Sequence, residues 1–587
     1  MSDAISLVEK ILLYKDLILS DRFIWFSVFS LLVLIAYYLK QYNQMIFFTI
    51  ISTILFYNSM FTYFWEKSYL KDISSSINRY DNNTTKHLLE KKYLLLSYPA
   101  RIQFEILKIE SNLLFQDSIN DVFQNFKKLE ERKLLHINGE YQEVILIKAN
   151  LYRQVENIKM LEETLLKLDS KTLNSKQLLS YKINESFLYE FNGNIKKAKD
   201  TLLSLLEQNN INKAILFNSI ARLEEMQNND KQAIHYYEKA YEKLLEKEEA
   251  KLFHIILHNL VVLNSKINKD QEAFQWLNKY EMLIDKKVTE QYLEFINTQI
   301  ILARQLKDRI LLLDSYSKSS SYIQPYLNRD NWLANFISKL RMSFHDNVNF
   351  DENMISAKNL FNELKELEFP KNYFTVKEIF HILKQLDERR QLGVMQNFYL
   401  EIIDNIFSFE NEIKQYRKTI PELAISEQFF WMQEENFLYK IKLSKQPSNT
   451  HFEEFFDDIK QLTSYSKTYK NKYLEMKSYM IILDEYIAYS QVLDSKFKND
   501  FQDIAKESLI NCENLMQKNL GNYRFIEYLI PLGYYYSVMD ADYIKASEYL
   551  KLFQSKKINI MQYANWQRLY YDKLIKAVNF KEISNSK

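Results

Sequence analysis

The sequence predicts an all-α protein in which a two-helix transmembrane hairpin precedes a solenoid of helical hairpins. Its 587 residues include only five glycines and six prolines, whereas strand-rich and βαβ folds use glycine freely at their turns. The first 65 residues contain two long uncharged stretches. Farther along the chain, pairs of apolar-periodic segments separated by short polar turns recur. A chain of this length exceeds what one core can hold, and a repeat array accounts for its size.

Composition excludes several classes of protein. Lys and Arg number 77 against 76 Asp and Glu, so the chain has no overall field for holding nucleic acid. The single cysteine, Cys512, excludes an intrachain disulfide framework and any CxxC redox or zinc motif. The closest two glycines, Gly521 and Gly533, lie too far apart for a phosphate-cradling loop or a GxSxG nucleophile elbow. We therefore expect no cofactor.

The histidines offer one candidate metal pair. His254 and His258 lie one helical turn apart, but the sequence HIILH lacks the glutamate that a zinc peptidase uses as its base, and no third ligand is evident. Cys512, in SLINCENLM, is most simply a small buried residue, because no base that could activate it is identifiable. We expect no metal site and no enzyme.

Two apolar stretches near the N-terminus predict a transmembrane helical hairpin. Residues 23–39 carry no charge and, at about 1.5 Å per residue, span roughly 25 Å as a helix. A second uncharged stretch covers residues 41–65, and the short turn between the two suits antiparallel spans. A cleaved signal peptide fits poorly, because no small-x-small site precedes Lys40 and another apolar run follows at once. Residues 1–22, with an apolar stripe beside charges, predict an amphipathic interfacial segment.

Basic residues predict the orientation of this hairpin. They flank its two outer ends, whereas the turn holds Lys40 alone, and an excess of Lys and Arg marks the cytoplasmic side. The N-terminus and the solenoid are therefore expected in the cytoplasm, anchored in the cell membrane by two spans. Residues 66–90 are expected to form a linking loop or broken helix. The flanking basic residues are Lys10, Lys15 and Arg22 before the first span, and Lys67, Lys71 and Arg79 after the second.

Residues 214–247 define the unit from which the rest of the chain is built. They read as an apolar-periodic helix, a polar NND break and a second apolar-periodic helix. Within each helix the apolar residues recur at spacings of three and four, which places them on one face. These residues are Phe217, Ile220 and Ala221 in the first helix, and Ala233, Tyr237 and Ala240 in the second. The layout resembles a tetratricopeptide repeat, and the resemblance implies stacked helical hairpins whose concave face binds protein segments.

Further copies of this unit appear along the chain. Ala198 precedes Ala233 by 35 residues, close to the roughly 34-residue period of tetratricopeptide repeats. Repeats of this kind are expected in residues 91–290, followed by irregular helices in residues 291–515. A C-terminal repeat with capping helices is expected in residues 516–587, with a turn one residue longer than usual. It is indicated by Leu532, Gly533 and Tyr536, which match the L-G-x-x-Y core of the motif, and then by Ala546, Leu550 and Phe553.

The sequence favours a membrane-anchored scaffold or adaptor whose helical solenoid binds a protein partner. A second possibility is a peptide-sensing regulator whose repeat groove grips a peptide backbone through amide side chains. Asn218, Asn259 and Asn264 are the candidate partner-binding residues for such a groove. A third possibility is an effector or enzyme with a site hidden in residues 371–515, which would require a pocket with convergent polar groups. The composition, rich in Lys, Asn and Tyr, suggests a bacterial protein.

Overall fold

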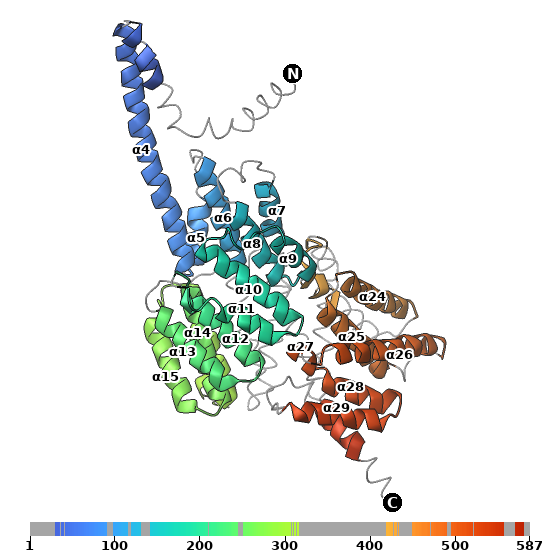
Figure 1. The fold of residues 1–587 in the computed structure, drawn as a ribbon. Coiled ribbons are helices and arrows are strands. Elements are labelled where there is room, and N and C mark those ends of the chain that lie inside the picture. The colour runs from blue at the N-terminus through green and yellow to red at the C-terminus, as the bar shows by residue number, and fades with distance from the viewer. Residues whose placement is uncertain are drawn as a thin grey trace, which may run out of the picture. The chain divides into compact units, whose positions relative to one another are not determined.

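The computed structural model of the chain consists of helices joined by turns (Figure 1). It describes residues 30–39, 42–90, 98–115, 119–130, 141–244, 250–315, 418–433, 449–489, 495–556 and 570–579, apart from a few single positions. No strand occurs in these ranges, which confirms the all-α prediction. The predicted amphipathic segment 1–22 lies outside the described residues, as do residues 321–417 of the predicted irregular region.

Contacts divide the chain into two compact units. Unit 1 comprises Met1–Lys148, Tyr241–His258 and Gln275–Thr298, and unit 2 comprises Ala149–Ala240, Asn259–Phe274 and Gln299–Lys587. Unit 1 contains α4 (Tyr42–Asn78), α5 (Asn82–Glu90), α6 (Tyr98–Leu114) and α7 (Ile119–Glu130). Unit 2 contains α9 (Ile158–Leu165), α10 (Ser175–Phe191), α11 (Ile195–Leu203), α12 (Lys213–Met226), α24 (Asn449–Thr468), α25 (Lys472–Tyr489), α26 (Ser495–Lys518), α27 (Tyr523–Ile526), α28 (Leu529–Met539) and α29 (Tyr543–Ser555). Helices with residues in both units are α8 (Tyr141–Gln154), α13 (Asp230–Leu244), α14 (Ala250–Lys266), α15 (Asp270–Leu283) and α16 (Thr289–Leu306).

The first described residues of unit 1 form an antiparallel helical pair. Residues 30–35 are helical, a turn follows at Leu39, and α4 begins at Tyr42. Ser30 Oγ lies 2.7 Å from Ser52 Oγ on α4, so the two helical segments run side by side. α4 continues to Asn78 and extends well beyond α5 and α6 (Figure 1). Within the described residues, no helix combines the length and the apolar character needed to cross a membrane.

The C-terminal half of α4 is packed against its neighbours in unit 1. Tyr69 and Ile73 are buried in a cluster with residues of α6, and the Tyr69 hydroxyl donates to the Leu88 carbonyl at 2.6 Å. Residues 66–90, expected as a linking loop or broken helix, are therefore helical with a single break at residues 79–81. The physical reason is that their apolar side chains recur at helical spacing and are buried against α6.

Four hairpin turns of unit 2 share one geometry. A residue with positive φ follows the first helix, and the next N–H donates to the carbonyl five positions earlier, which is the Schellman arrangement. Asn194 is an example, because its N–H donates to the Tyr189 carbonyl at 2.8 Å and its side chain accepts from the Lys197 N–H at 3.0 Å. These four short polar turns in the sequence thus adopt the same backbone turn. The positive-φ residues are Glu156 (53°), Gly193 (79°), Asn228 (57°) and Asn268 (60°).

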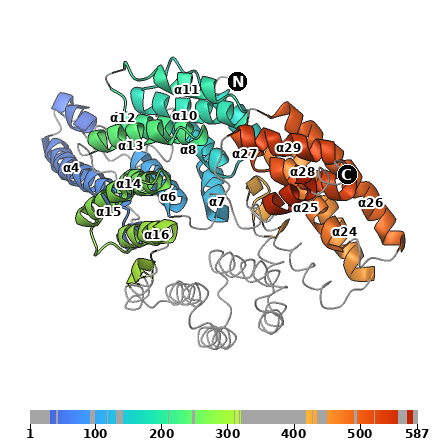
Figure 2. The same ribbon diagram turned by 90° about the horizontal axis from the view of Figure 1, so that it is seen from below.

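The apolar faces predicted for residues 214–247 lie in the core, except that Phe217 is only half-buried. Ala233, Tyr237 and Ala240 on α13 are at most 1% exposed, and Ile220 and Ala221 on α12 are fully buried. Figure 2 shows α10, α11 and α12 side by side, as their mutual contacts require. The repeating helix-turn-helix pattern is therefore a property of the fold. In the other hairpins, the residue equivalent to Ala233 is also fully buried. These residues are Leu161, Ala198, Ala273 and Ala546.

The C-terminal hairpin of unit 2, formed by α28 and α29, has a longer turn. The Asp542 N–H donates to the Tyr536 carbonyl at 3.0 Å, six positions earlier, and Ala541 has a φ of 49°. The predicted extra residue in this turn is thereby confirmed. Gly533 permits close packing of the two helices, because a Cβ there would meet the Cβ of Tyr549 at 3.1 Å.

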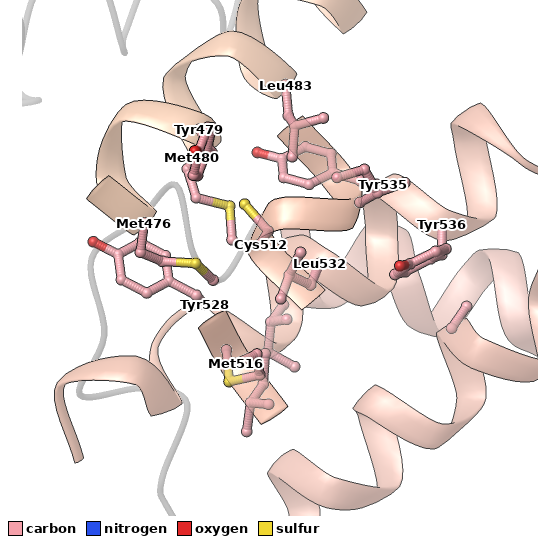
Figure 3. Close-up of a cluster of buried hydrophobic side chains, with 14 of the residues drawn as sticks. Met476, Tyr479, Met480, Leu483, Cys512, Met516, Tyr528, Leu532, Tyr535 and Tyr536 are labelled. Atoms are coloured by element: carbon pink, nitrogen blue, oxygen red, sulfur yellow. The ribbon is translucent and has the colours of Figure 1, made fainter. Parts of the chain in front are cut away.

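The core beneath this hairpin is rich in sulfur and aromatic side chains. Figure 3 shows Cys512 among Met476, Met480 and Met516, and all four residues are at most 5% exposed. Burial raises the pKa of the Cys512 thiol, and the charge of Glu475 raises it further. The thiol is therefore protonated at neutral pH, which agrees with the prediction that Cys512 is a small buried core residue.

Replacing Ala233 with Trp should lower the free energy of unfolding by about 1 to 3 kcal/mol, because the fully buried α12–α13 contact has no space for a larger side chain. Hydrogen exchange should show loss of protection first in α12 and α13. The same substitution at Lys231, which is exposed at the start of α13, should change stability by less than about 0.5 kcal/mol. Equal loss of protection in α12–α13 and α28–α29 would contradict a repeat-like, locally coupled array.

Candidate functional site

The three asparagines predicted to bind a partner all lie in unit 2, on α12 and α14. Asn264 is buried, and its amide donates to the Leu260 carbonyl at 2.8 Å, so this side chain is directed into the protein. The Asn259 side chain hydrogen-bonds to the Tyr237 hydroxyl. Asn218 is half-buried, and its Oδ1 has no hydrogen-bond partner among the described residues. That oxygen is itself buried and does not face solvent.

A cavity of about 350 Å³ lies elsewhere in unit 2, at the turns of two consecutive helical hairpins. The α10–α11 turn and the end of α12 form one side, and α27 with the end of α29 forms the other. Two lysines, one phenol and several apolar side chains line the cavity, and its lining contains no carboxylate. The lining residues are Gly193, Asn194, Ile195, Lys196, Met226, Gln227, Asn228, Leu520, Tyr523, Ile526 and Lys556.

The two sides of the cavity are held together through Gly193 and Asn522. Asn522 donates from Nδ2 to the Phe191 carbonyl at 3.0 Å, and its Oδ1 accepts from the Arg524 N–H at 3.1 Å, which caps α27. Gly193 has a φ of 79°, and a Cβ at this position would meet the Asn522 Cβ at 3.1 Å. Glycine therefore satisfies both the left-handed turn and the close approach of the Asn522 side chain.

Glu190 at the end of α10 lies behind the Tyr523 wall of the cavity and is fully buried. Arg222 of α12 forms a two-point contact with its carboxylate, with Nη1 3.2 Å from Oε1 and Nη2 bonded to Oε2. The Tyr523 hydroxyl also donates to Glu190 Oε1, at 3.1 Å. A buried carboxylate requires such partners, because its charge is otherwise costly to remove from water.

Arg524 connects α27 to Glu156, which follows α8, and to Glu190 at the end of α10. Its Nη1 donates to Glu156 Oε1 at 2.8 Å, and its Nη2 lies 3.9 Å from Glu190 Oε1. The guanidinium also lies 5.3 Å from the centre of the Phe191 ring. Burial lowers the pKa of Arg524, but the charges of Glu156 and Tyr523 and the hydrogen bonds to both residues together raise it by more, so the net shift is upward. The wall that carries Tyr523 is thus fixed by charge-assisted bonds.

Arg153 on α8 adds positive charge to this network. Burial and the neighbouring Arg222 lower its pKa to about 10, and Glu190 partly offsets the shift. Its Nε is buried and has no hydrogen-bond partner among the described residues. Arg153, Arg222 and Arg524 thus lie around the buried carboxylate of Glu190.

The two histidines considered as a metal pair lie in unit 1 and are engaged in hydrogen bonds. His254 Nδ1 lies 2.8 Å from the Tyr280 hydroxyl, and His258 Nδ1 lies 2.9 Å from Thr298 Oγ1. Burial lowers the pKa of His254 to about 4 and also lowers that of His258. Glu294, the carboxylate near both rings, is paired with Lys251 at 2.8 Å. No group of three His, Cys, Asp or Glu side chains arranged to hold a metal occurs in the part of the chain that the structure describes.

Sequence reasoning did not identify the cavity residues, although one local signal was present. Gly193 is one of only five glycines in the chain, and it stands in the turn FNGN. Nothing local links this turn to the segment NYR at residues 522–524, which the structure places against it.

A search of protein-family models and a search of curated proteins both find no match to this chain.

Proposed function

We propose that this protein is a membrane-anchored scaffold whose helical hairpins bind a segment of a partner protein. The observation that carries the anchor is the exposure of large apolar side chains along the N-terminal helical pair. Exposed apolar surface of this extent is unfavourable in water, and a bilayer removes that penalty. These side chains, each at least 45% exposed, are Leu31, Leu34, Ile35, Tyr37, Tyr38, Leu39, Ile46, Phe47, Ile50, Ile54 and Phe64.

The Ser30–Ser52 hydrogen bond supports the same proposal. It joins two helical segments whose surrounding residues are apolar, and a hydroxyl pair of this kind satisfies polar groups that lipid would leave without partners. The basic residues outside the two apolar stretches favour an orientation with the N-terminus and the repeats in the cytoplasm.

The repeated hairpins support the scaffold role. Stacked hairpins bury their apolar faces against their neighbours and leave a long outer surface for recognition. In unit 2 this surface includes the lysine-lined cavity. Binding of a protein segment uses such a surface without requiring catalytic groups.

The proposal predicts that membrane attachment and partner binding separate on truncation. A chain lacking residues 1–61 should leave the membrane fraction and still crosslink to the protein that the full chain captures in its own membranes. This truncation retains Trp65, whose ring stacks on Tyr69 at 5.6 Å and belongs to the core of unit 1.

An impermeant thiol reagent on intact cells should label Tyr42→Cys and spare the exposed site Glu90→Cys, both in a Cys512→Ser background.

Several outcomes would contradict the proposal. Sedimentation of the truncated chain with lipid after a high-salt wash would show that the hairpin is not the sole anchor. Labelling of Glu90→Cys alone would reverse the orientation. Failure of the full chain to crosslink reproducibly to any protein would remove the scaffold function.

A further inference from the structure

We infer that the cavity of unit 2 receives an apolar side chain standing next to a carboxylate in an extended segment of the partner protein. The inference rests on the proposed scaffold function and specifies the chemistry of the partner. It depends on three properties of the cavity: the apolar side chains in its lining, its two lysines and its hydrogen-bonded walls.

The apolar side chains in a lining that also holds asparagine, glutamine and lysine, together with the size of the cavity, favour one large side chain. Ile195, Met226 and Ile526 are buried or half-buried in the lining, and Leu520 is 39% exposed. A volume of about 350 Å³ is near the lower end of the range for ligand pockets, which extends from roughly 300 to 1,000 Å³. A leucine or aromatic side chain would fill such a space and remove the exposed Leu520 surface from water.

The charge of the cavity favours a carboxylate beside that side chain. Lys196 and Lys556 line it, and neither forms an ion pair with another described residue. Glu190, behind the wall, is already paired with Arg222 and therefore does not offset the lysines. A carboxylate would gain attraction to both ammonium groups, whereas a basic segment would be repelled.

The walls of the cavity are held in place by hydrogen bonds within the chain. Tyr523 is held by its bond to Glu190, and Asn522 is held by its bond to the Phe191 carbonyl. Little side-chain entropy is therefore lost when the cavity is filled, and short segments can bind measurably. The cavity forms only where α27 meets the hairpin turns, so it is a property of this chain's tertiary structure.

Saturation-transfer NMR on the full chain in lipid nanodiscs tests the inference with defined probes. N-acetyl-Leu-Glu-amide should bind. N-acetyl-Leu-Gln-amide lacks the charge and should bind at least about tenfold more weakly. N-acetyl-Ser-Glu-amide lacks the apolar side chain and should also bind at least about tenfold more weakly. A Lys196→Glu, Lys556→Glu double variant should lose the preference for Glu over Gln. A matched Lys231→Glu, Lys551→Glu variant changes exposed lysines on α13 and α29 and should retain it.

A neutral variant separates loss of the cavity from loss of charge or folding. Gln227 is exposed in the lining at a φ of −87°, which tryptophan accepts, so Gln227→Trp should fill the cavity with little change in thermal stability. Binding of N-acetyl-Leu-Glu-amide should fall at least about tenfold. Equal binding of all three probes, or unchanged binding to Gln227→Trp, would overturn the inference.

The same variants distinguish this inference from the scaffold proposal. If Gln227→Trp captures the partner as efficiently as the natural chain does in membranes, the scaffold function stands and the cavity is not its binding site. If the natural chain captures no partner, the scaffold proposal fails whatever the peptide probes show. Loss of both probe binding and partner capture in Gln227→Trp supports the two proposals together.

Discussion

Replacing Glu190 with Gln should lower the free energy of unfolding by about 3 kcal/mol. The substitution keeps the shape of the side chain but removes a fully buried charge that faces Arg222 and Arg524. Breaking a buried ion pair by removing one partner typically costs about 3 to 5 kcal/mol, because the remaining charges lose their compensation. The lower end of that range is expected because the Arg222 side chain is 40% exposed and remains partly hydrated.

Chemical denaturation of the full chain, with hydrogen exchange to locate the effect, measures this change. Protection should fall in α10, α12 and α27, the helices that Glu190 connects. Glu162→Gln makes the same chemical change at an exposed position on α9 and should alter stability by less than about 0.5 kcal/mol. A loss below about 1 kcal/mol for Glu190→Gln would show that the arginine network contributes little to the wall of the cavity.

Unit 1 should lose stability as the pH falls from about 6.5 to about 4. His254 is 2% exposed, and its pKa is about 4 in the folded chain against 6.5 for an ordinary histidine. In this interval the unfolded histidine binds a proton that the folded one does not, so acid favours unfolding. The contribution of neutral His254 to the free energy of unfolding is complete above about pH 6.5. It is lost as the pH falls to about 4, by up to about 3 kcal/mol at 1.36 kcal/mol per pKa unit.

Thermal unfolding of the natural chain and of His254→Gln over this pH range measures the contribution. The glutamine variant removes the titrating group and should show a shallower loss of stability between pH 6.5 and 4. Burial also lowers the pKa of His258, so part of the pH dependence should persist in His254→Gln. His235→Gln, which removes an exposed histidine from α13, should retain the natural profile. Identical profiles for His254→Gln and the natural chain would show that His254 does not govern acid stability.

The helical hairpins were predictable because their determinants are local. Ala233, Tyr237 and Ala240 recur at helical spacing, and the NND turn beside them supplies Asn228, a residue type that tolerates positive φ. The longer turn before Tyr543 was predictable for the same reason. Residues 66–90 match the broken-helix alternative of the prediction, but their packing against α6 was not predictable, because it depends on contacts between separate segments.

The candidate site shows where local patterns stop being sufficient. Asn264 was predicted as a partner-binding residue from its type and helix, but its amide donates to a backbone carbonyl inside the core. The sequence around an asparagine does not distinguish a side chain that binds a partner from one that bonds to the backbone inside the core. The role of such a side chain depends on which way the helix face points, and neighbouring helices determine that direction.

The sequence by itself determined the all-α class and the positions of the repeated hairpins and their turns, because apolar periodicity and turn chemistry act within a few residues. Only the tertiary structure decided that Asn522 meets the Phe191 carbonyl, 331 residues away, and that Lys196 and Lys556 line one cavity. The physical reason is that a contact between distant segments depends on how every intervening helix packs. A glycine in a turn permits such a close approach, but it does not identify the segment that approaches.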